Sequence, residues 1–217
     1  MSEIQVIKRD GNKDTMDLEK LHKVVFYACD GINGVSASEV EIKSSLQFYS
    51  GITSSEIQET LIKSAADLIS EEQPNYQWVA GRLICYHLRK MVYGQFEPWH
   101  VLDLIKTNVE EGFYDSLLLE KYTEQEWDEL NSHLKHERDE RMTYAAMEQW
   151  RGKYLVQNRV TNIIKETPQM AYMLISATLF AEYPRDTRLQ WVKDYYCLLY
   201  TSPSPRDRTR SRMPSSA

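Results

Sequence analysis

Basic side chains lie at several positions where they could bind a polyphosphate. Lys8 and Arg9 directly precede a predicted turn, and Lys20 lies in the first turns of a predicted helix, where the helix dipole also favours anions. Lys90 lies near the end of a later helix. A nucleoside triphosphate carries about four negative charges, which cations, oriented N–H groups or a metal ion must offset. If the helices pack over the strands beside the turn, these side chains converge, and we expect an anion site there.

The phosphate-binding loops of the common nucleotide-binding folds are absent. The sequence contains neither GxxxxGK followed by Ser or Thr nor GxGxxG, so neither a P-loop nor a Rossmann phosphate grip is predicted. A Lys-Arg pair beside a turn is most often simply solvated, so these cations alone do not identify a site. Among the aromatic residues Tyr76, Trp78 and Tyr86, which are more often core than base platforms, Tyr86 is the best placed for stacking.

Two histidines have a spacing that could suggest a metal site. His133 and His136 are three residues apart, and Glu137 follows directly. Such pairs on a polar helix are usually surface residues, although the ligand types would suit zinc. We therefore predict no metal-binding residue.

The three cysteines are too dispersed for a zinc ribbon or a disulfide framework. Cys29, Cys85 and Cys197 form no CxxC pair, which is typical of a chain in a reducing cytoplasm. Cys29 and Cys85 lie among apolar positions and are predicted to be small buried hydrophobes.

Hydrophobic periodicity predicts a mainly α fold. Alternation over residues 4–8, the Asp10-Gly11 dipeptide and a return strand over 14–16 predict a β-hairpin. Asp17 is the expected N-cap of a first helix, and capping boxes are expected at Ser36 and Thr53. Helices are predicted over 17–30, 36–47, 54–68, 75–92, 98–111, 123–134 (with a third capping box at Thr123), 142–149, 168–181 and 184–196, and a short strand over 153–157.

These elements predict three segments. Residues 4–94 form a small hairpin or sheet capped by four helices, 95–196 form an all-α region, and 197–217 are rich in Ser, Pro and Arg and are expected to lack a core and be disordered. The last segment is also expected to be non-native, because the helical pattern stops in mid-element. Leu174, Phe180, Leu189 and Val192 would then lack a surface to pack on.

Composition excludes several broad classes. Hydrophobic residues make up 42% of the 217 residues, charged residues 27%, and the net charge is −6. An acidic body argues against general nucleic-acid binding. No apolar run approaches the roughly 18 residues of a membrane span, and the start of the chain lacks a secretory pattern.

Several motifs together carry a family resemblance. Residues 6–11 (VIKRDG), 63–69 (KSAADLI) and 87–94 (HLRKMVYG) resemble the ATP-cone domain. Residues 95–98 (QFEP), 136–139 (HERD), 153–156 (KYLV) and 183–188 (YPRDTR) resemble the large (alpha) subunit of class I aerobic ribonucleotide reductases of bacteria and their phages. The resemblance covers about residues 4–196.

The resemblance implies the N-terminal allosteric part of an enzyme that reduces ribonucleoside diphosphates to deoxyribonucleotides. The parent would sense ATP or dATP, with Mg²⁺, form a large-subunit homodimer and receive a radical from the metallocofactor of a small beta subunit. None of the cysteines here matches a catalytic cysteine, so no catalytic residue is predicted and the chain alone is expected to be inactive.

The candidate effector site combines matching positions with the residues singled out above. Gln58 stands where relatives often have histidine, and Asp17 stands where asparagine is usual. An aspartate at position 17 repels phosphate but could cap the helix or help hold Mg²⁺. The candidate residues are Lys8, Arg9, Asp14, Thr15, Met16, Asp17, Leu18, Glu19, Lys20, Ser54, Gln58, Tyr86 and Lys90.

Two other functions remain open at this stage. A stand-alone nucleotide sensor, such as a cone-bearing transcriptional repressor, would want a zinc ribbon or a basic DNA-reading helix before the cone. A helical scaffold without a ligand would leave the hairpin cations unexplained. A thermal-shift titration with ATP and dATP separates the scaffold from the others.

Overall fold

The computed structural model describes residues 4–9 and 11–201, which are mainly helical, as the sequence predicts. They divide into two compact units. The first contains the chain up to Trp99 together with residues 135–168, and the second contains residues 100–134 with the chain from Gln169 onward. The predicted three-segment division of the chain stays a prediction.

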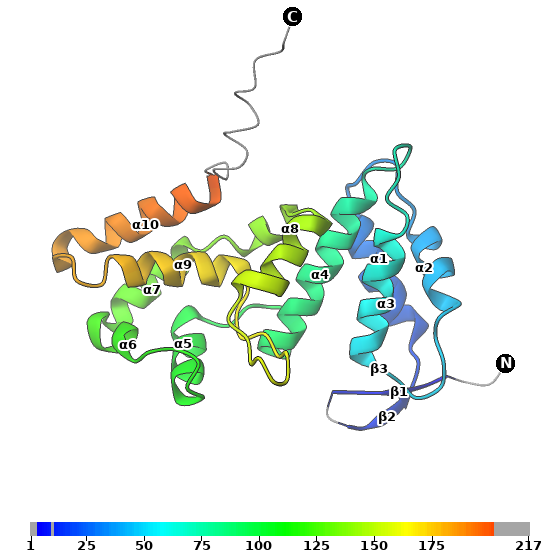
Figure 1. The fold of residues 1–217 in the computed structure, drawn as a ribbon, viewed down its shortest axis with the longest axis horizontal. Coiled ribbons are helices and arrows are strands. Elements are labelled where there is room, and N and C mark those ends of the chain that lie inside the picture. The colour runs from blue at the N-terminus through cyan, green and yellow to red at the C-terminus, as the bar shows by residue number, and fades with distance from the viewer. Residues whose placement is uncertain (1–3, 10, 202–217) are drawn as a thin grey trace, which may run out of the picture. The chain divides into compact units, whose positions relative to one another are not determined.

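Figure 1 labels the elements along the chain. In chain order they are β1 Gln5–Ile7, β2 Lys13–Thr15, α1 Leu18–Cys29, α2 Ala37–Ser45, β3 Ile52–Thr53, α3 Ser54–Ala66, α4 Tyr76–Tyr93, α5 Val101–Glu110, α6 Leu117–Lys121, α7 Glu124–His133, η1 His136–Arg141, α8 Tyr144–Gln149, η2 Trp150–Tyr154, α9 Pro168–Leu179 and α10 Arg185–Thr201.

The N-terminal hairpin belongs to a three-stranded sheet with the order β2-β1-β3. β1 pairs antiparallel with β2, as predicted, with Val6 opposite Asp14. Gly11 takes a left-handed backbone conformation, φ 82°, in the turn between them. β3 was not predicted: it is only two residues long and pairs parallel with β1, with Ile52 opposite Val6. The sheet lies at one end of the helices α1 to α4 (Figure 1).

Two of the predicted helix caps in the first unit are confirmed. Asp17 caps α1 by accepting a hydrogen bond of 3.0 Å from the Lys20 amide. Thr53 and Glu56 form a reciprocal capping box at the start of α3. Both caps orient the first turns that face the sheet.

The capping box predicted at Ser36 is wrong. The Ser36 side chain makes no capping hydrogen bond at the start of α2. Glu39 instead accepts a hydrogen bond of 2.7 Å from the hydroxyl of Tyr76, which also accepts one from the Ser36 amide. A partner from a distant helix has replaced the local one, because the buried Tyr76 hydroxyl needs polar partners.

Helix α4 is the central element of the first unit. It packs against α1 and α3 on one side and against η1 and α8 on the other. Gly81 sits where α4 meets the backbone at residues 142 and 143, and a Cβ at Gly81 would overlap the carbonyl oxygen of Met142. Residues 135–168 therefore belong to the same packed core as helices α1 to α4.

The strand predicted over 153–157 is wrong. Residues 150–154 instead form a π-helical turn that continues α8. Only an isolated bridge between Gln157 and Ile164 follows it. Several boundaries also differ: α5 begins at Val101 rather than near 98, and α6 and η1 were not predicted.

The second unit is helical and contains a buried ion pair. Arg188 in α10 donates to Glu126 in α7, and the two side chains are 3% and 14% exposed. The Arg188 guanidinium also lies 4.3 Å from the ring centroid of Tyr122. The capping box predicted at Thr123 is present and uses the same Glu126.

The prediction that apolar side chains of the last two helices would lack a surface to pack on is partly wrong. Leu174 and Val192 are buried, at 6% and 0% exposure. The large exposed apolar side chains of α9, α10 and the loop between them are Ile175, Leu179, Tyr183, Trp191 and Leu198.

The predicted start of the disordered tail is too early. α10 includes residues 197–201, so these five residues are helical. The rest of that predicted tail, residues 202–217, lies outside the described residues. Within the described part of the chain, no helix combines the length and the apolar character that a bilayer crossing requires.

Candidate functional site

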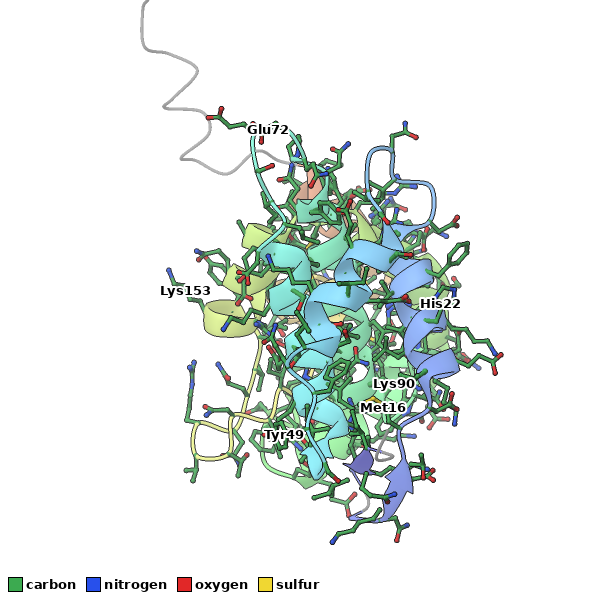
Figure 2. The ribbon with its side chains drawn as sticks, turned by 90° about the vertical axis from the view of Figure 1, so that its right-hand side faces the viewer. Met16, His22, Tyr49, Glu72, Lys90 and Lys153 are labelled. Carbon is green, nitrogen blue, oxygen red and sulfur yellow. The ribbon has the colours of Figure 1, made fainter. Side chains whose placement is uncertain are left out.

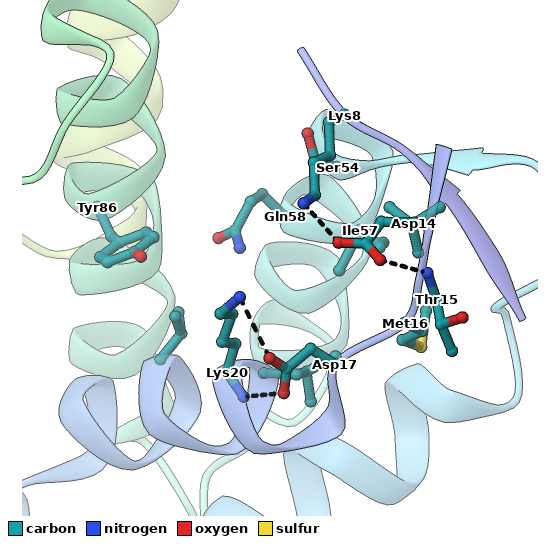
Figure 3. Close-up of a pocket in the computed structure, with 13 residues that line it drawn as sticks. Lys8, Asp14, Thr15, Met16, Asp17, Lys20, Ser54, Ile57, Gln58 and Tyr86 are labelled. Atoms are coloured by element: carbon teal, nitrogen blue, oxygen red, sulfur yellow. Dashed lines mark hydrogen bonds and ion pairs between the residues drawn. The ribbon is translucent and has the colours of Figure 1, made fainter. Parts of the chain in front are cut away.

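A pocket opens where the hairpin, the first turns of α1, the start of α3 and Tyr86 of α4 meet. Figure 3 shows Lys8 and Lys20 on the charged side of this pocket and Tyr86 on the neighbouring helix. The lining residues come from segments far apart in the chain, which the small sheet brings together. They are Val6, Lys8, Asp14, Thr15, Met16, Asp17, Lys20, Leu21, Val24, Ser54, Ile57, Gln58 and Tyr86.

The charged side of the pocket consists of two neighbouring ion pairs. Lys8 lies 2.5 Å from Asp14, and Lys20 lies 3.2 Å from Asp17 (Figure 3). The hydrogen bond from Lys8 lowers the pKa of Asp14, and the hydrogen bond from the Lys20 amide lowers the pKa of Asp17. Both carboxylates are therefore ionised at neutral pH, and the pocket presents two cations and two anions.

The rest of the pocket lining is largely apolar, with hydroxyl or amide groups at Thr15, Ser54, Gln58 and Tyr86. Four of its residues were not predicted from the sequence, although their helical or strand spacing marks them as inward-facing; they are Val6, Leu21, Val24 and Ile57. Burial raises the pKa of the Tyr86 hydroxyl, so the ring is neutral. A neutral ring beside aliphatic side chains is suited to stacking on a base.

Most of the predicted site residues line this pocket, but four do not. Leu18 is 67% exposed, and Glu19 pairs with Lys23 at 3.0 Å. Successive helical residues are about 100° apart, so these two point away from the face that carries Asp17 and Lys20. Their role as ligands stays a prediction.

Arg9 and Lys90 also lie outside the pocket lining. Arg9 Nη1 donates a 2.6 Å hydrogen bond to the Lys90 carbonyl oxygen, which ties the hairpin to the end of α4. The Lys90 ammonium lies 5.8 Å from the ring centroid of Tyr86, and Figure 2 shows Lys90 at the same end of the unit as Met16. Both cations are near the pocket rather than in its wall.

A second hollow lies against the opposite face of α3. Glu59, which follows Gln58, turns into it and pairs with Arg151 of η2 at 2.7 Å. Arg151 also pairs with Glu148 at 2.7 Å. Burial lowers the pKa of His87, which lies 3.4 Å from Glu59, to about 4. Helix α3 thus carries Ser54, Ile57 and Gln58 in the pocket beside the hairpin, and on its other face Glu59 contacts Arg151.

The two histidines whose spacing could suggest a metal site have different surroundings. Burial lowers the pKa of His136 to about 4, and His133 Nε2 lies 3.6 Å from the Cys197 sulfur. All three cysteines are free, with Cys85 buried and Cys29 partly exposed. Among the described residues, no three His, Cys, Asp or Glu side chains are grouped to hold a metal ion.

Two family models match the chain. The ATP cone domain matches residues 4–91, which include the hairpin, α1 to α3, Tyr86 and Lys90. The all-alpha domain of ribonucleotide reductase matches residues 140–204, beyond the position near 196 where the sequence resemblance was expected to end.

The chain is also similar to curated proteins that are named as alpha subunits of ribonucleoside-diphosphate reductase. The chain is 51% identical over 191 residues to ribonucleoside-diphosphate reductase 1 subunit alpha of Escherichia coli (strain K12), covering 88% of this chain and 25% of that protein. It is 49% identical over 193 residues to the subunit alpha of Haemophilus influenzae, covering 89% and 26%. It is 41% identical over 198 residues to the subunit alpha of Enterobacteria phage T4, covering 90% and 26%.

The chain spans about a quarter of the length of these relatives. Its cone, its all-alpha segment and its similarity to relatives over most of its own length show that it belongs to the ribonucleoside-diphosphate reductase alpha-subunit family. It corresponds to the N-terminal regulatory part of that subunit.

Proposed function

We propose that the pocket beside the hairpin binds ATP or dATP and that this binding regulates the reductase to which the chain belongs. The observation that carries the proposal is the pairing of two lysines with a neutral aromatic ring across one pocket inside the ATP cone match. The lysines would contact the phosphates and Tyr86 the base. Ser54, at the first position of α3, adds a hydroxyl and the positive end of a helix dipole.

We further propose that the nucleotide binds with Mg²⁺. Asp14 and Asp17 each neutralise a lysine in the pocket, so a triphosphate alone would meet little net positive charge. Carboxylate oxygens are suitable Mg²⁺ ligands, and Mg²⁺ commonly uses one or two of them together with substrate phosphates. The donor set therefore fits a magnesium-nucleotide complex, in which Asp14 or Asp17 would release its lysine to the phosphates.

The test is isothermal titration of the full chain with ATP and with dATP, with Mg²⁺ and with excess chelator. We expect binding of both nucleotides and a loss of affinity without Mg²⁺. Lys8→Met should weaken binding by roughly 1.5–3 kcal/mol, the range for hydrogen bonds to charged groups. Lys13→Met removes a lysine from the same hairpin but outside the pocket lining, and should change the affinity little. Absence of heat with both nucleotides, while the protein is folded, contradicts the proposal.

For the whole protein we propose the activity that the family name describes, reduction of ribonucleoside diphosphates in the cytoplasm. The family resemblance also implies two partners for the whole protein. One is a small beta subunit that holds the radical metallocofactor, and the other is a second large subunit, with which it would form a homodimer. The all-alpha segment would belong to the body of that large subunit. The cone would bind ATP or dATP and thereby regulate the activity of the subunit.

The chain by itself should show no reductase activity. Burial raises the pKa of the Cys29 thiol to about 11 and also raises that of Cys85, so neither is a ready thiolate, and no cysteine matches the catalytic ones. The measurement is deoxynucleotide formation after the chain is mixed with a competent radical subunit, a dithiol and a ribonucleoside diphosphate. Any product above the level of the radical subunit alone would show that the chain contains a catalytic centre.

A further inference from the structure

Helix α3 carries polar side chains on two opposite faces. Ser54 and Gln58 lie in the pocket beside the hairpin (Figure 3). Glu59 and Lys63 lie in the hollow on the other face, because successive residues of a helix point about 100° apart. The backbone hydrogen bonds make a helix stiff, so a movement of α3 toward the pocket carries Glu59 away from the far side of the hollow.

An ion pair spans this hollow. Arg151 Nη1 donates a 2.7 Å hydrogen bond to Glu59 Oε1, and the other two guanidinium nitrogens donate at 2.9 and 2.7 Å to the two carboxylate oxygens of Glu148. Helix α3 packs mainly against α2, α4 and β3, whereas η2, which contains Arg151, packs mainly against α8. The Glu59–Arg151 pair therefore links two elements that pack chiefly on other neighbours.

The same ion pair joins segments that match two different family models. Glu59 lies in the segment that matches the ATP cone domain. Arg151 lies in the segment that matches the all-alpha domain of ribonucleotide reductase. A change in the position of α3 thus reaches the all-alpha segment directly through this contact.

The link is built so that it can break at little cost. The Glu59 side chain is 46% exposed, and ion pairs of this kind contribute little to stability. Arg151 would keep its second partner, Glu148. Arg151 also belongs to a π-helical turn, in which the Leu155 amide donates a 3.1 Å hydrogen bond to the Trp150 carbonyl oxygen. Such turns are rare and occur frequently at functional sites.

We propose that the Glu59–Arg151 ion pair opposes nucleotide binding to the cone and transmits that binding to residues 150–154. This inference rests on the proposed function, since it needs a nucleotide in the pocket beside the hairpin. A nucleotide held by Ser54 and the lysines draws α3 toward the pocket and separates Glu59 from Arg151. Arg151 then pairs with Glu148 alone. Because coupling between two sites is reciprocal, removing the ion pair eases nucleotide binding.

The first test measures the affinity of the full chain for ATP, with Mg²⁺, by isothermal titration. We expect Glu59→Gln and Arg151→Met each to bind ATP about two- to fivefold more tightly than the unmodified protein, the effect of losing one partly exposed ion pair. The double variant should bind like either single variant, because both substitutions remove the same interaction. Glu124→Gln, which breaks the exposed Lys106–Glu124 pair of the second unit, should leave the affinity unchanged.

Hydrogen exchange, followed by mass spectrometry, adds a readout that a purely structural role of the ion pair would not change. Saturating ATP with Mg²⁺ should speed the exchange of the amides of residues 150–155 in the unmodified protein, since the turn loses its contact with α3. The same addition should have little effect on these amides in Arg151→Met, in which that contact is already absent.

Each contrary result has a definite meaning. Unchanged or weaker ATP binding in both single variants refutes the inference and leaves the proposed nucleotide site intact. Additive effects of the two substitutions also refute it, as does exchange at residues 150–155 that ATP does not accelerate. Absence of ATP binding to the unmodified, folded protein overturns the proposed function together with this inference.

Discussion

Gly81→Ala is expected to destabilise the first compact unit by about 2 kcal/mol. An added Cβ would overlap the carbonyl oxygen of Met142, and the carbon atoms of residues 142 and 143 lie only 3.2 and 3.1 Å away. Because the obstacle is backbone, relief requires α4 to move, and overpacking of this kind costs about 3 kcal/mol. Alanine favours a helix over glycine by about 1 kcal/mol, which offsets part of that cost.

Chemical denaturation of the full chain, followed by circular dichroism, measures this change. Gly152→Ala is the matched control, because a Cβ at Gly152 meets nothing within 4 Å and Gly152 lies in η2 of the same unit. It should shift the midpoint slightly or not at all. A stabilising effect of Gly81→Ala would mean that α4 does not pack against residues 142 and 143 in this way.

Arg188→Met is expected to destabilise the second unit by about 3 kcal/mol. The guanidinium is 3% exposed and donates to both carboxylate oxygens of Glu126. Removing one partner of a buried ion pair leaves the other charge uncompensated, at a cost of about 3–5 kcal/mol. The lower end applies because Glu126 keeps its hydrogen bonds from Thr123 in the capping box.

Thermal or chemical unfolding of Arg188→Met is best compared with that of Lys193→Met. Lys193 also joins α10 to α7, at 2.6 Å from Glu129, but that carboxylate is 52% exposed. A pair of this kind contributes less than about 1 kcal/mol. Equal effects of the two substitutions would show that burial of Arg188 is not the source of its stabilisation.

The same ion pair makes the stability of the second unit depend on pH. Burial alone raises the pKa of Glu126, but the hydrogen bonds from Arg188 and Thr123 outweigh it, and the net pKa lies below the ordinary value of 4.5. A carboxyl group with a lowered pKa in the folded state contributes stability that is complete above pH 4.5 and is lost as the pH falls through the folded pKa. Arg188→Met should flatten this acid dependence.

The sequence by itself determined the local elements and much of the polar side of the site. The hairpin, the Asp17 cap and the capping boxes at Thr53 and Thr123 each depend on residues within a few positions of one another. Lys8 and Lys20 were found for the same reason, since one lies beside a turn and the other at a helix start, whereas Asp14 entered the candidate site through the family resemblance.

Only the tertiary structure decided which partners distant segments would choose. β3 forms because Ile52 and Thr53 pair with the edge of β1, which lies more than forty residues earlier in the chain. A strand of two residues has too short a pattern to be predicted from the sequence. Glu39 does not take part in the capping box predicted at Ser36, because its carboxylate accepts a hydrogen bond from the Tyr76 hydroxyl. The π-helical turn at 150–154 places Arg151 on Glu59, although the local sequence suggested a strand.

The same distinction applies inside the candidate site. Tyr86 reaches the hairpin only because α4 packs along α1 and α3. The faces of α1 and α3 were also decided by packing: Leu18 and Glu19 turn outward, whereas Gln58 turns to one pocket and Glu59 to another. Local patterns depend on neighbouring residues and their backbone preferences. The direction in which a helix face points is decided by the apolar surface that it buries against other elements, and that surface exists only once the chain has folded.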